Sequence, residues 1–455
     1  MTDRIHDVLI IGGGLVGASL ACALDGSGLD VALVEAEPPR ASVIADADAR
    51  SLALAAASLN ALDALDVSRH FPIAPTPIRR IHVSRRGDFG SVSIRAEDYG
   101  RSAFGGVVPA PSLGVALQAR LRELRGLTHH TGARLIALRE ADGAREADIV
   151  RDGETITLRA RLLVGADGTA SFVRSELGIA ASSHDYEQHL FAGSARAARP
   201  SDGQAWERFT DDGPMALLPR AAGDYGCICT MPSARAEDIA ALDDAGFIAL
   251  LQERFGWRAG RFLAVGRRVG YPLRQLVAER LVASRAVIMG NAAQTLHPIG
   301  AQGFNLGLRD ALTLAELARD AREHGGDVGG AALLDAYAQR RAEDREQTIG
   351  FSDGLARITS NPSPPLRLLR SLAMHALDAL PDLRASLVGG AMGFRGVVPA
   401  LARDVVNQAK SKFSVPGEPV QSMDGQMSRA HGDGRMPEVE QRIDAVAGRA
   451  GATEP

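Results

Sequence analysis

Three glycines and one carboxylate near the N-terminus have the types and spacing needed to bind a dinucleotide. Gly12, Gly14 and Gly17 form the pattern G-x-G-x-x-G between two apolar runs. In such a turn the first glycine permits a tight bend, the second lets backbone N–H groups approach a pyrophosphate, and the third lets helix and strand pack closely. Glu35 ends the next apolar run, where a carboxylate can accept from both hydroxyls of an adenosine ribose. A glycine-rich turn without a ligand is the alternative.

A second polar stretch follows a later apolar run. Asp167 and Gly168 come directly after residues 162–165 and are followed by Ser171 and Arg174. An Asp-Gly pair at the end of a strand can be a plain turn, and that alternative stays open here. Arg50 stands at the start of the stretch 51–54, which we expect to be helical. Taken alone, Arg50 is either a surface cap or a cofactor contact.

A third stretch combines a strand end with a glycine-bearing loop. Asn291 follows an apolar run, and the loop passes Pro298 before Gln302 and Gly303 open an apolar helix. The N-terminus of that helix could receive a phosphate or a polarised ring edge. His297, beside the proline, is either a structural residue or a contact of substrate or cofactor.

Strands and helices that alternate along the chain must position these residues. Residues 8–11, 15–24 and 31–35 predict one βαβ unit, and Asp152-Gly153 between apolar runs predicts a hairpin. Residues 71–105 lose the helical period and predict a small antiparallel insertion.

The predicted fold class is therefore α/β, with one nucleotide-binding domain interrupted twice by segments of a second sheet. We expect a Rossmann-like domain from 1–70, 106–181 and 276–345, a β-rich domain from 71–105 and 182–275, a C-terminal helical segment at 346–414 and a disordered tail at 415–455.

Composition excludes several classes of function. The chain has 51 basic and 55 acidic residues, so there is no electrostatic case for nucleic acid as a partner. Its three cysteines have no CxxC or metal spacing, which favours a reducing compartment and no metal site. Glycines interrupt the apolar run 8–24, which disfavours a signal peptide. We expect a cytoplasmic protein, with contact to the inner face of the membrane as an open alternative.

In their order along the chain, the three stretches resemble the flavoprotein aromatic hydroxylases, which are single-component FAD monooxygenases. The resemblance covers residues 5 to about 400. The stretches Gly290-Asn291-Ala292-Ala293-Gln294-Thr295-Leu296-His297-Pro298 and Gln302-Gly303-Phe304-Asn305-Leu306-Gly307 look like the ubiquinone-biosynthesis branch. Asp185-Tyr186, Glu207-Arg208-Phe209 and Leu217-Leu218-Pro219 are similar to the substrate sheet of that branch.

The resemblance implies a Rossmann-like FAD-binding domain interrupted by a β-rich substrate domain, and it implies a role for each motif. Gly12, Gly14, Gly17 and Glu35 would bind the ADP half of FAD. Arg50 and Asp167 would lie by the pyrophosphate and ribityl chain, and Asp167 could also serve NADH or NADPH. Asn291 would face the ribityl hydroxyls, with Pro298, Gln302 and Gly303 near the isoalloxazine.

Two positions depart from the family pattern. Most relatives have aspartate where this chain has Asn291, and an amide still hydrogen-bonds a hydroxyl but adds no charge. The family's Gly-Gln-Gly loop is here Gly300-Ala301-Gln302-Gly303. If the missing glycine is needed for a positive φ or for a close approach to the flavin, Ala301 strains the loop, and Gly300 is the alternative residue for the turn.

The resemblance also implies the chemistry and the partners. A reduced flavin captures O₂, and its C4a-hydroperoxide hydroxylates an electron-rich ring, so no catalytic triad or metal motif is required. The substrate would be a polyprenyl phenol, which must be met at a bilayer or in a quinone-biosynthesis complex. The helical segment 365–395 is either the membrane-docking surface or packed on the protein's own body.

Two alternatives to this function stay open. One is a flavoprotein of the same fold with another aromatic or isoprenoid substrate. The other is a non-catalytic assembly subunit of a quinone-biosynthesis complex, for which the departures at Asn291 and Ala301 give a foothold.

Overall fold

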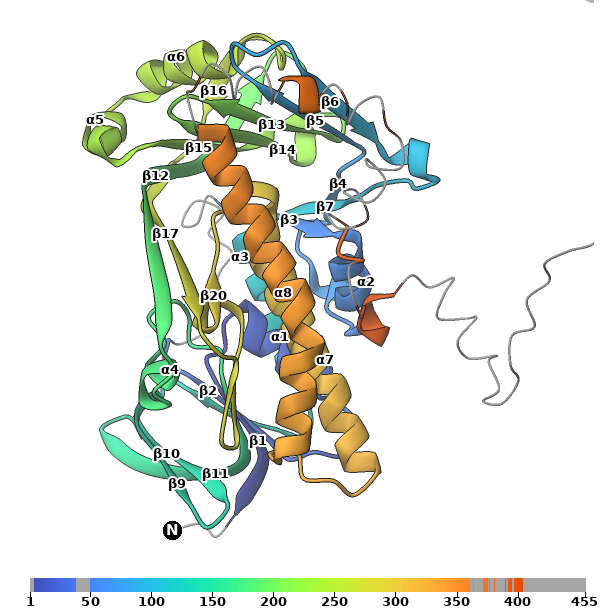
Figure 1. Cartoon of the computed structure of the whole chain (residues 1–455), viewed down its shortest axis with the longest axis vertical. Coiled ribbons are helices and arrows are strands. Elements are labelled where there is room, and N and C mark those ends of the chain that lie inside the picture. The colour runs from blue at the N-terminus through green and yellow to red at the C-terminus, as the bar shows by residue number, and fades with distance from the viewer. Residues whose placement is uncertain are drawn as a thin grey trace, which may run out of the picture. The chain divides into compact units, whose positions relative to one another are not determined.

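A computed structural model describes residues 4–37 and 50–360, with short stretches and single residues between 363 and 403 (Figure 1). The described part is a mixed α/β structure with three sheets. The expected segment 365–395 lies largely, and the expected tail 415–455 wholly, outside the described residues. No helix among the described residues is both long and apolar enough to cross a membrane.

The first sheet contains the predicted βαβ unit. Its strands lie in the order β18 (Val282–Ala283), β19 (Ala286–Ile288), β11 (Glu154–Gly165), β1 (Ile5–Ile11), β2 (Val31–Glu35) and β8 (Leu127–Thr131), while β10 (Ala144–Arg151) pairs with β11 and β9 (Arg134–Ala141) pairs with β10. The pairs from β19 to β8 are parallel. Parallel strands buried on both faces read as continuous apolar runs, as β1 and β2 do.

The helices that contribute residues to the apolar core around this sheet include α1 (Leu15–Ala23), α2 (Ala56–Ala64), α3 (Ala110–Leu121) and α7 (Gln302–Glu323). The predicted hairpin is confirmed, because β10 and β11 are antiparallel around Asp152 and Gly153. Both turn residues have positive φ, 53° and 83°, as a tight two-residue hairpin turn requires.

Apart from the short strand β20, the strands of the second sheet lie mainly in the segments 71–105 and 182–275 that were expected to interrupt the nucleotide-binding domain. Its strands lie in the order β20 (Gln294–Thr295), β17 (Val269–Ala278), β12 (Ala181–Ala197), β15 (Tyr225–Pro232), β14 (Gly213–Pro219), β13 (Gln204–Thr210), β5 (Arg80–Arg85) and β6 (Ser91–Arg95), with β16 (Phe262–Val265) beside β12. The domain boundaries themselves stay a prediction.

Two helices, α5 (Ala236–Ala240) and α6 (Asp244–Phe255), pack with the second sheet in a separate apolar cluster. Cys227 and Cys229 of β15 belong to that cluster. With Cys22 in α1 they are all buried, free thiols. Burial raises the pKa of both Cys22 and Cys227 to about 12.

The third sheet corrects one prediction. Residues 51–54 were expected to be helical, but β3 (Ser51–Ala55) pairs with β7 (Gly105–Pro109), and β4 (Thr76–Pro77) pairs with the same strand. The helix α2 begins only at Ala56. Pairing with β7 satisfies the backbone of this Ala- and Leu-rich segment, and that tertiary contact overrides its helical propensity.

The last two long helices lie side by side, α7 and α8 (Ala331–Ser360) (Figure 1). Buried ion pairs join them, Arg309 to Asp344 and Arg341 to Asp310, each at 2.7 Å. The short helix α4 (Phe172–Glu176) follows β11.

Candidate cofactor-binding site

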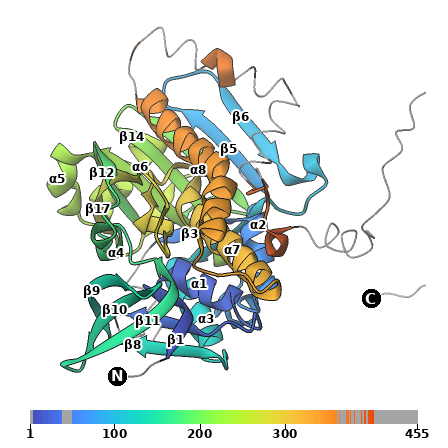
Figure 2. The same ribbon diagram turned by 60° about the horizontal axis from the view of Figure 1, so that its bottom comes forward.

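The three polar stretches begin at one edge of the first sheet. Ile11, Gly165 and Ile288 end the strands β1, β11 and β19, and they are register partners across these neighbouring parallel strands. The residues that follow each strand therefore start at the same level, on the carboxyl edge where α/β sheets bind ligands. Figure 2 shows β1 and β11 in this sheet, with α1 next to them.

The glycine turn is packed from both sides. Gly12 has a φ of +104°, and a Cβ there would lie 2.4 Å from the carbonyl oxygen of Ala166. At Gly17 a Cβ would lie 1.9 Å from the oxygen of Gly12. No atom lies within 4 Å of the Cβ position of Gly14, which is the N-cap of α1 and has no side-chain cap. The turn therefore closes tightly while its middle glycine faces open space.

Glu35 lies against this turn. Its Oε2 accepts a hydrogen bond from the Gly13 N–H over 2.6 Å, and its Oε1 accepts from the Glu37 N–H over 2.8 Å. The carboxylate is therefore fixed at the end of β2, beside the N-terminus of α1.

Asp167 lies at the same edge but already has partners. Its Oδ1 accepts from the Ser171 hydroxyl over 2.5 Å and its Oδ2 from the Val173 N–H over 3.0 Å, so the carboxylate caps α4. Arg174 then donates to the carbonyl oxygens of Thr169 and Ala292, which joins the second stretch to the third.

Asn291 lies in a short 3₁₀ turn, Gly290–Ala292, after β19. It is exposed, and its side-chain amide makes no hydrogen bond with the described residues. Gly290, with a φ of +57°, packs against Val16 of α1, as does Gly307 of α7. These close contacts bring the third stretch against the first helix.

The loop before α7 has the strain that the sequence predicted. Ala301 has a φ of +52° as the N-cap of α7, and Gly300 has a φ of +69°. Gln302 donates to the Gly300 oxygen over 3.1 Å, and no atom lies within 4 Å of the Cβ position of Gly303. As at Gly14, an uncapped helix N-terminus and a bare glycine face open space.

His297 is buried, with 1% of its surface exposed, and both ring nitrogens are engaged. Nδ1 accepts from the Ile299 N–H over 3.3 Å, so Nε2 carries the proton and donates to Gln188 over 3.2 Å. Burial lowers its pKa to about 4. This geometry favours the structural alternative for His297, and a catalytic role stays a prediction.

Two tethers were not predicted from the sequence. The Asn305 side chain accepts from Ala55 N–H over 2.9 Å and donates to Ala53 oxygen over 3.0 Å, which fixes α7 to β3. Arg345 of α8 donates to Gln294 over 2.9 Å. Asn305 belongs to the sequence motif Gln302–Gly307, so its importance could be inferred from the sequence. The residues around Arg345 form no motif that would indicate its partner.

These residues fit a dinucleotide such as FAD. Gly14 and Gly303 leave room beside two uncapped helix N-termini, where backbone N–H groups lack intrahelical partners. Glu35 lies at the first terminus, and the side-chain amide of Asn291, which makes no hydrogen bond with the described residues, lies along the same edge. Exposed Arg50 precedes β3, which is bonded to the start of α7. The individual cofactor contacts stay predictions.

Comparisons with known proteins agree with this geometry. Residues 6–352 match the family described as FAD binding domain. The ubiquinone hydroxylase UbiL of Rhodospirillum rubrum is 36% identical over 86% of this chain and 90% of its own length. The 3-demethoxyubiquinol 3-hydroxylase of Escherichia coli is 30% identical over 86% of this chain and 100% of its own.

Solved structures agree in fold. The p-nitrophenol 4-monooxygenase PnpA of Pseudomonas putida has a TM-score of 0.70 at 18% identity, over 87% of this chain and all 100% of that one. Aklavinone-11 hydroxylase, solved with FAD and aklavinone, has a TM-score of 0.62 at 22% identity, over 79% and 70%. The chain therefore belongs to the FAD binding domain family of flavoprotein hydroxylases.

Proposed function

We propose that the protein hydroxylates the aromatic ring of a polyprenyl phenol in ubiquinone biosynthesis, with FAD as cofactor and with NADH or NADPH and O₂ as co-substrates. The observation that supports this most strongly is the register of Ile11, Gly165 and Ile288, which starts all three motif stretches at one sheet edge. The relatives named as ubiquinone hydroxylases support the choice of pathway.

The chain's own residues would bind and orient the cofactor and the substrate, and they would exclude water from the site. FAD, when bound, would supply the electron transfer from the nicotinamide and the reaction with O₂. The N-terminus of α1 would hold the pyrophosphate beside Gly14, while Glu35 would hold the ribose. The N-terminus of α7 would face the ring system at Gln302 and Gly303, tied to β3 through Asn305.

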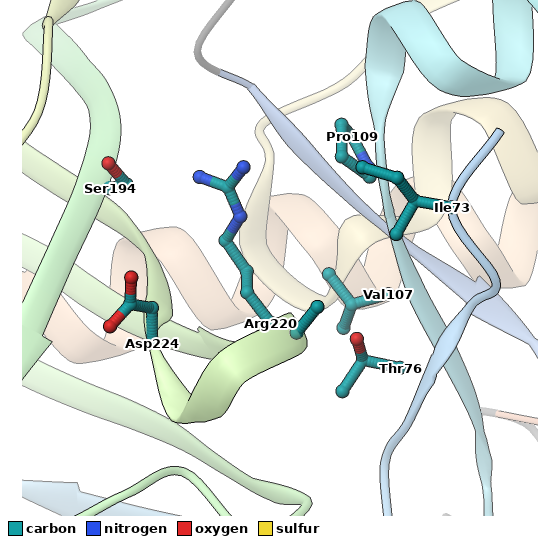
Figure 3. A pocket seen from close by; sticks show the side chains of 8 residues that line it. Ile73, Thr76, Val107, Pro109, Ser194, Arg220 and Asp224 are labelled. Carbon is teal, nitrogen blue, oxygen red and sulfur yellow. The ribbon is translucent and has the colours of Figure 1, made fainter. Parts of the chain in front are cut away.

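A pocket beside β7 has the size and lining for a single ring (Figure 3). Its volume is about 170 Å³, and its lining residues are Ile73, Thr76, Val107, Pro109, Ser194, Arg220, Ala221 and Asp224. Pro109 is the register partner of Ser51, which follows Arg50. The pocket therefore lies one strand away from the start of β3, beside which Arg50 is expected to contact the cofactor.

The polar groups of this pocket favour an oxygen substituent on the ring. Asp224 is already held by Arg196, with hydrogen bonds of 2.9 and 3.2 Å. The Arg220 guanidinium and the Ser194 hydroxyl make no hydrogen bond or ion pair with the described residues, and Figure 3 shows Arg220 extended between Ser194 and Pro109. One cation and one hydroxyl donor are thus left for a ligand oxygen.

Contact with the inner face of a membrane, and membership of a quinone-biosynthesis complex, belong to the same proposal. A polyprenyl chain partitions into lipid, so an enzyme that modifies its ring must reach the bilayer or receive the substrate from a carrier. These two points rest on the chemistry of the substrate.

The test is purification with FAD followed by turnover. The protein should bind FAD and become yellow, and a prenylated phenol should stimulate NAD(P)H consumption and yield a ring-hydroxylated product by mass spectrometry. In cells, deleting the gene should cause a quinone precursor to accumulate.

The same experiments separate the alternatives. Hydroxylation of an unrelated aromatic or isoprenoid compound, with no quinone precursor in the deletion strain, would favour another flavoprotein of this fold. A colourless protein that rejects FAD yet binds other pathway proteins would favour an assembly subunit.

A further inference from the structure

The second sheet presents two different faces to the rest of the protein. The residues of one face, here called the outer face, pack with α5 and α6, as Trp206, Met215 and Leu217 do. Strand alternation places Ala205, Glu207 and Phe209 on the other face, here called the inner face. The register puts Glu207 beside Ala216 of β14 and Val83 of β5. A carboxyl group therefore lies among apolar side chains.

The inner face looks toward the expected flavin. Phe209 packs with Ile299 of the loop before α7 and with Ala356 of α8. On the other side of Glu207, Ala205 packs with Val107, which lines the ring pocket. Glu207 therefore lies between two clusters, one at the flavin loop and one at the pocket.

Among the residues that the structure describes, Glu207 is without a polar partner. None of the described residues makes a hydrogen bond or ion pair with it, and no charged side chain perturbs it. Burial alone raises the pKa of its carboxyl to about 8, yet its side chain keeps some accessible surface. Glu207 is therefore half-buried and is not sealed inside a packed core.

The neighbouring charges are already engaged elsewhere. Arg85 of β5, on the same face as Val83, holds Asp211 at 2.5 Å and Asp88 at 3.4 Å. On α8, Asp353 accepts from Arg357 over 2.7 Å and from the Tyr186 hydroxyl over 3.2 Å. A buried carboxyl without a partner costs free energy, which a hydrogen-bonding ligand would offset.

We propose that Glu207 is a catalytic residue that accepts the hydroxyl proton of the phenol substrate during ring hydroxylation. The phenol O–H bond breaks, a carboxyl O–H bond forms, and the electron pair left on the phenolate oxygen enriches the ring for attack by an electrophile. No oxidant is consumed in this step. The inference rests on the proposed function, because it requires a phenol at this site.

The acid–base properties of the phenol and of Glu207 support the proposed proton transfer. An ordinary phenol has a pKa of about 10 and an ordinary glutamate one of about 4.3, so proton transfer between them is strongly uphill. A carboxyl whose pKa is about 8 is a better matched acceptor. The base must be ionised to act, so the hydroxylation rate should rise with pH toward a plateau above about 8.

The experiment is a single-turnover reaction of the pre-reduced, FAD-loaded enzyme with a prenylated phenol and O₂, which isolates hydroxylation from nicotinamide oxidation. Glu207→Gln should slow ring hydroxylation by about a hundredfold or more, the usual range for a lost general base, and abolish the pH-dependent rise. FAD content should be unchanged. A fluorinated phenol, which ionises more readily, should recover part of the lost rate.

The matched control is Glu237→Gln, an exposed glutamate of α5, which should behave as wild type. Hydroxylation by Glu207→Gln at the wild-type rate and pH dependence would overturn the proposal. If Glu207→Gln fails to retain FAD, the proposal is tested with Glu207→Asp and with the pH profile of the wild-type enzyme. A flat wild-type hydroxylation rate between pH 6 and 9 would also overturn the proposal. If the wild type hydroxylates no phenol, the proposed function itself has failed.

Discussion

Arg341 of α8 donates from Nε to Oδ1 of Asp310 in α7 over 2.7 Å, and each side chain is only 1% exposed. Arg341 also donates to Asp344, which in turn holds Arg309. Two cations and two anions are thus buried between the helix that begins at the flavin loop and the helix that packs beside it.

Removing one member of this network should destabilise the fold. Arg341→Met leaves Asp310 buried without its cation, and breaking a buried pair typically costs about 3–5 kcal/mol. Urea unfolding followed by circular dichroism measures the loss. As control, Arg95→Met removes an exposed arginine that is 3.2 Å from Glu97 and should cost less than about 1 kcal/mol. Equal losses in the two variants would contradict the assigned role.

Two glycines of the first turn should respond differently to alanine. At Gly14 an added methyl group meets no protein atom, so Gly14→Ala should cost less than about 1 kcal/mol of stability. It should weaken FAD binding at least about tenfold, because the methyl group occupies the space expected for the pyrophosphate. Isothermal titration with FAD measures the effect, and unchanged affinity would place the cofactor elsewhere.

At Gly17 the added Cβ would lie 1.9 Å from the Gly12 oxygen, a backbone atom that cannot move aside. Gly17→Ala should therefore lower the melting temperature as well as FAD binding, with a cost of about 1–3 kcal/mol or more. A fully stable Gly17→Ala protein would contradict the close packing of helix and turn.

Ala301→Gly should stabilise the protein. Ala301 occupies the left-handed region, which costs an L-residue roughly 1–2 kcal/mol, and glycine removes that cost while adding flexibility to the unfolded chain. The expected net gain is up to about 1 kcal/mol by urea unfolding. Ala400→Gly, at a 3₁₀ turn far along the chain, serves as control and should not stabilise. A destabilised Ala301→Gly would show that other contacts hold this residue.

Acid should destabilise the protein partly through His297. Its pKa in the folded state is about 4, below the ordinary value of 6.5, so the unfolded chain binds the proton first as pH falls. Stability is fully present above about pH 6.5 and falls toward pH 4, by about 2 kcal/mol between pH 7 and 5. His297→Gln should lose less over that interval in urea unfolding at the two pH values. An equal loss in both proteins would contradict this assignment.

Arg220→Gln should weaken ring binding in the pocket. A lost hydrogen bond to a charged group is worth about 1.5–3 kcal/mol, so a prenylated phenol should bind about tenfold or more weakly. The methyl ether of the same compound should be affected less. Quenching of flavin fluorescence measures both, with the exposed Arg235→Gln as control. Equal binding by wild type and Arg220→Gln would place the ring elsewhere.

Much of the first sheet could be predicted because its strands and turns are specified by residues that are close together in the sequence. The run before Gly12 and the Asp152-Gly153 turn each specify an element through neighbouring residues. Pairing between distant segments was harder to predict from the sequence. The segment β3 is a strand because it pairs with β7, some fifty residues later, and not because of its own composition. The site edge could be predicted from motif order, whereas the isolation of Glu207 and the engagement of Asp167 depend on the tertiary fold.

The three buried cysteines make the protein convenient for labelling studies. Cys22, Cys227 and Cys229 are at most 3% exposed, and burial raises the pKa of each thiol, so little reactive thiolate forms at neutral pH. One cysteine introduced at an exposed position such as Phe89 would then be the preferred target of a maleimide dye. A fluorophore there could report movement of the β5–β6 hairpin without first removing any natural sulfhydryl.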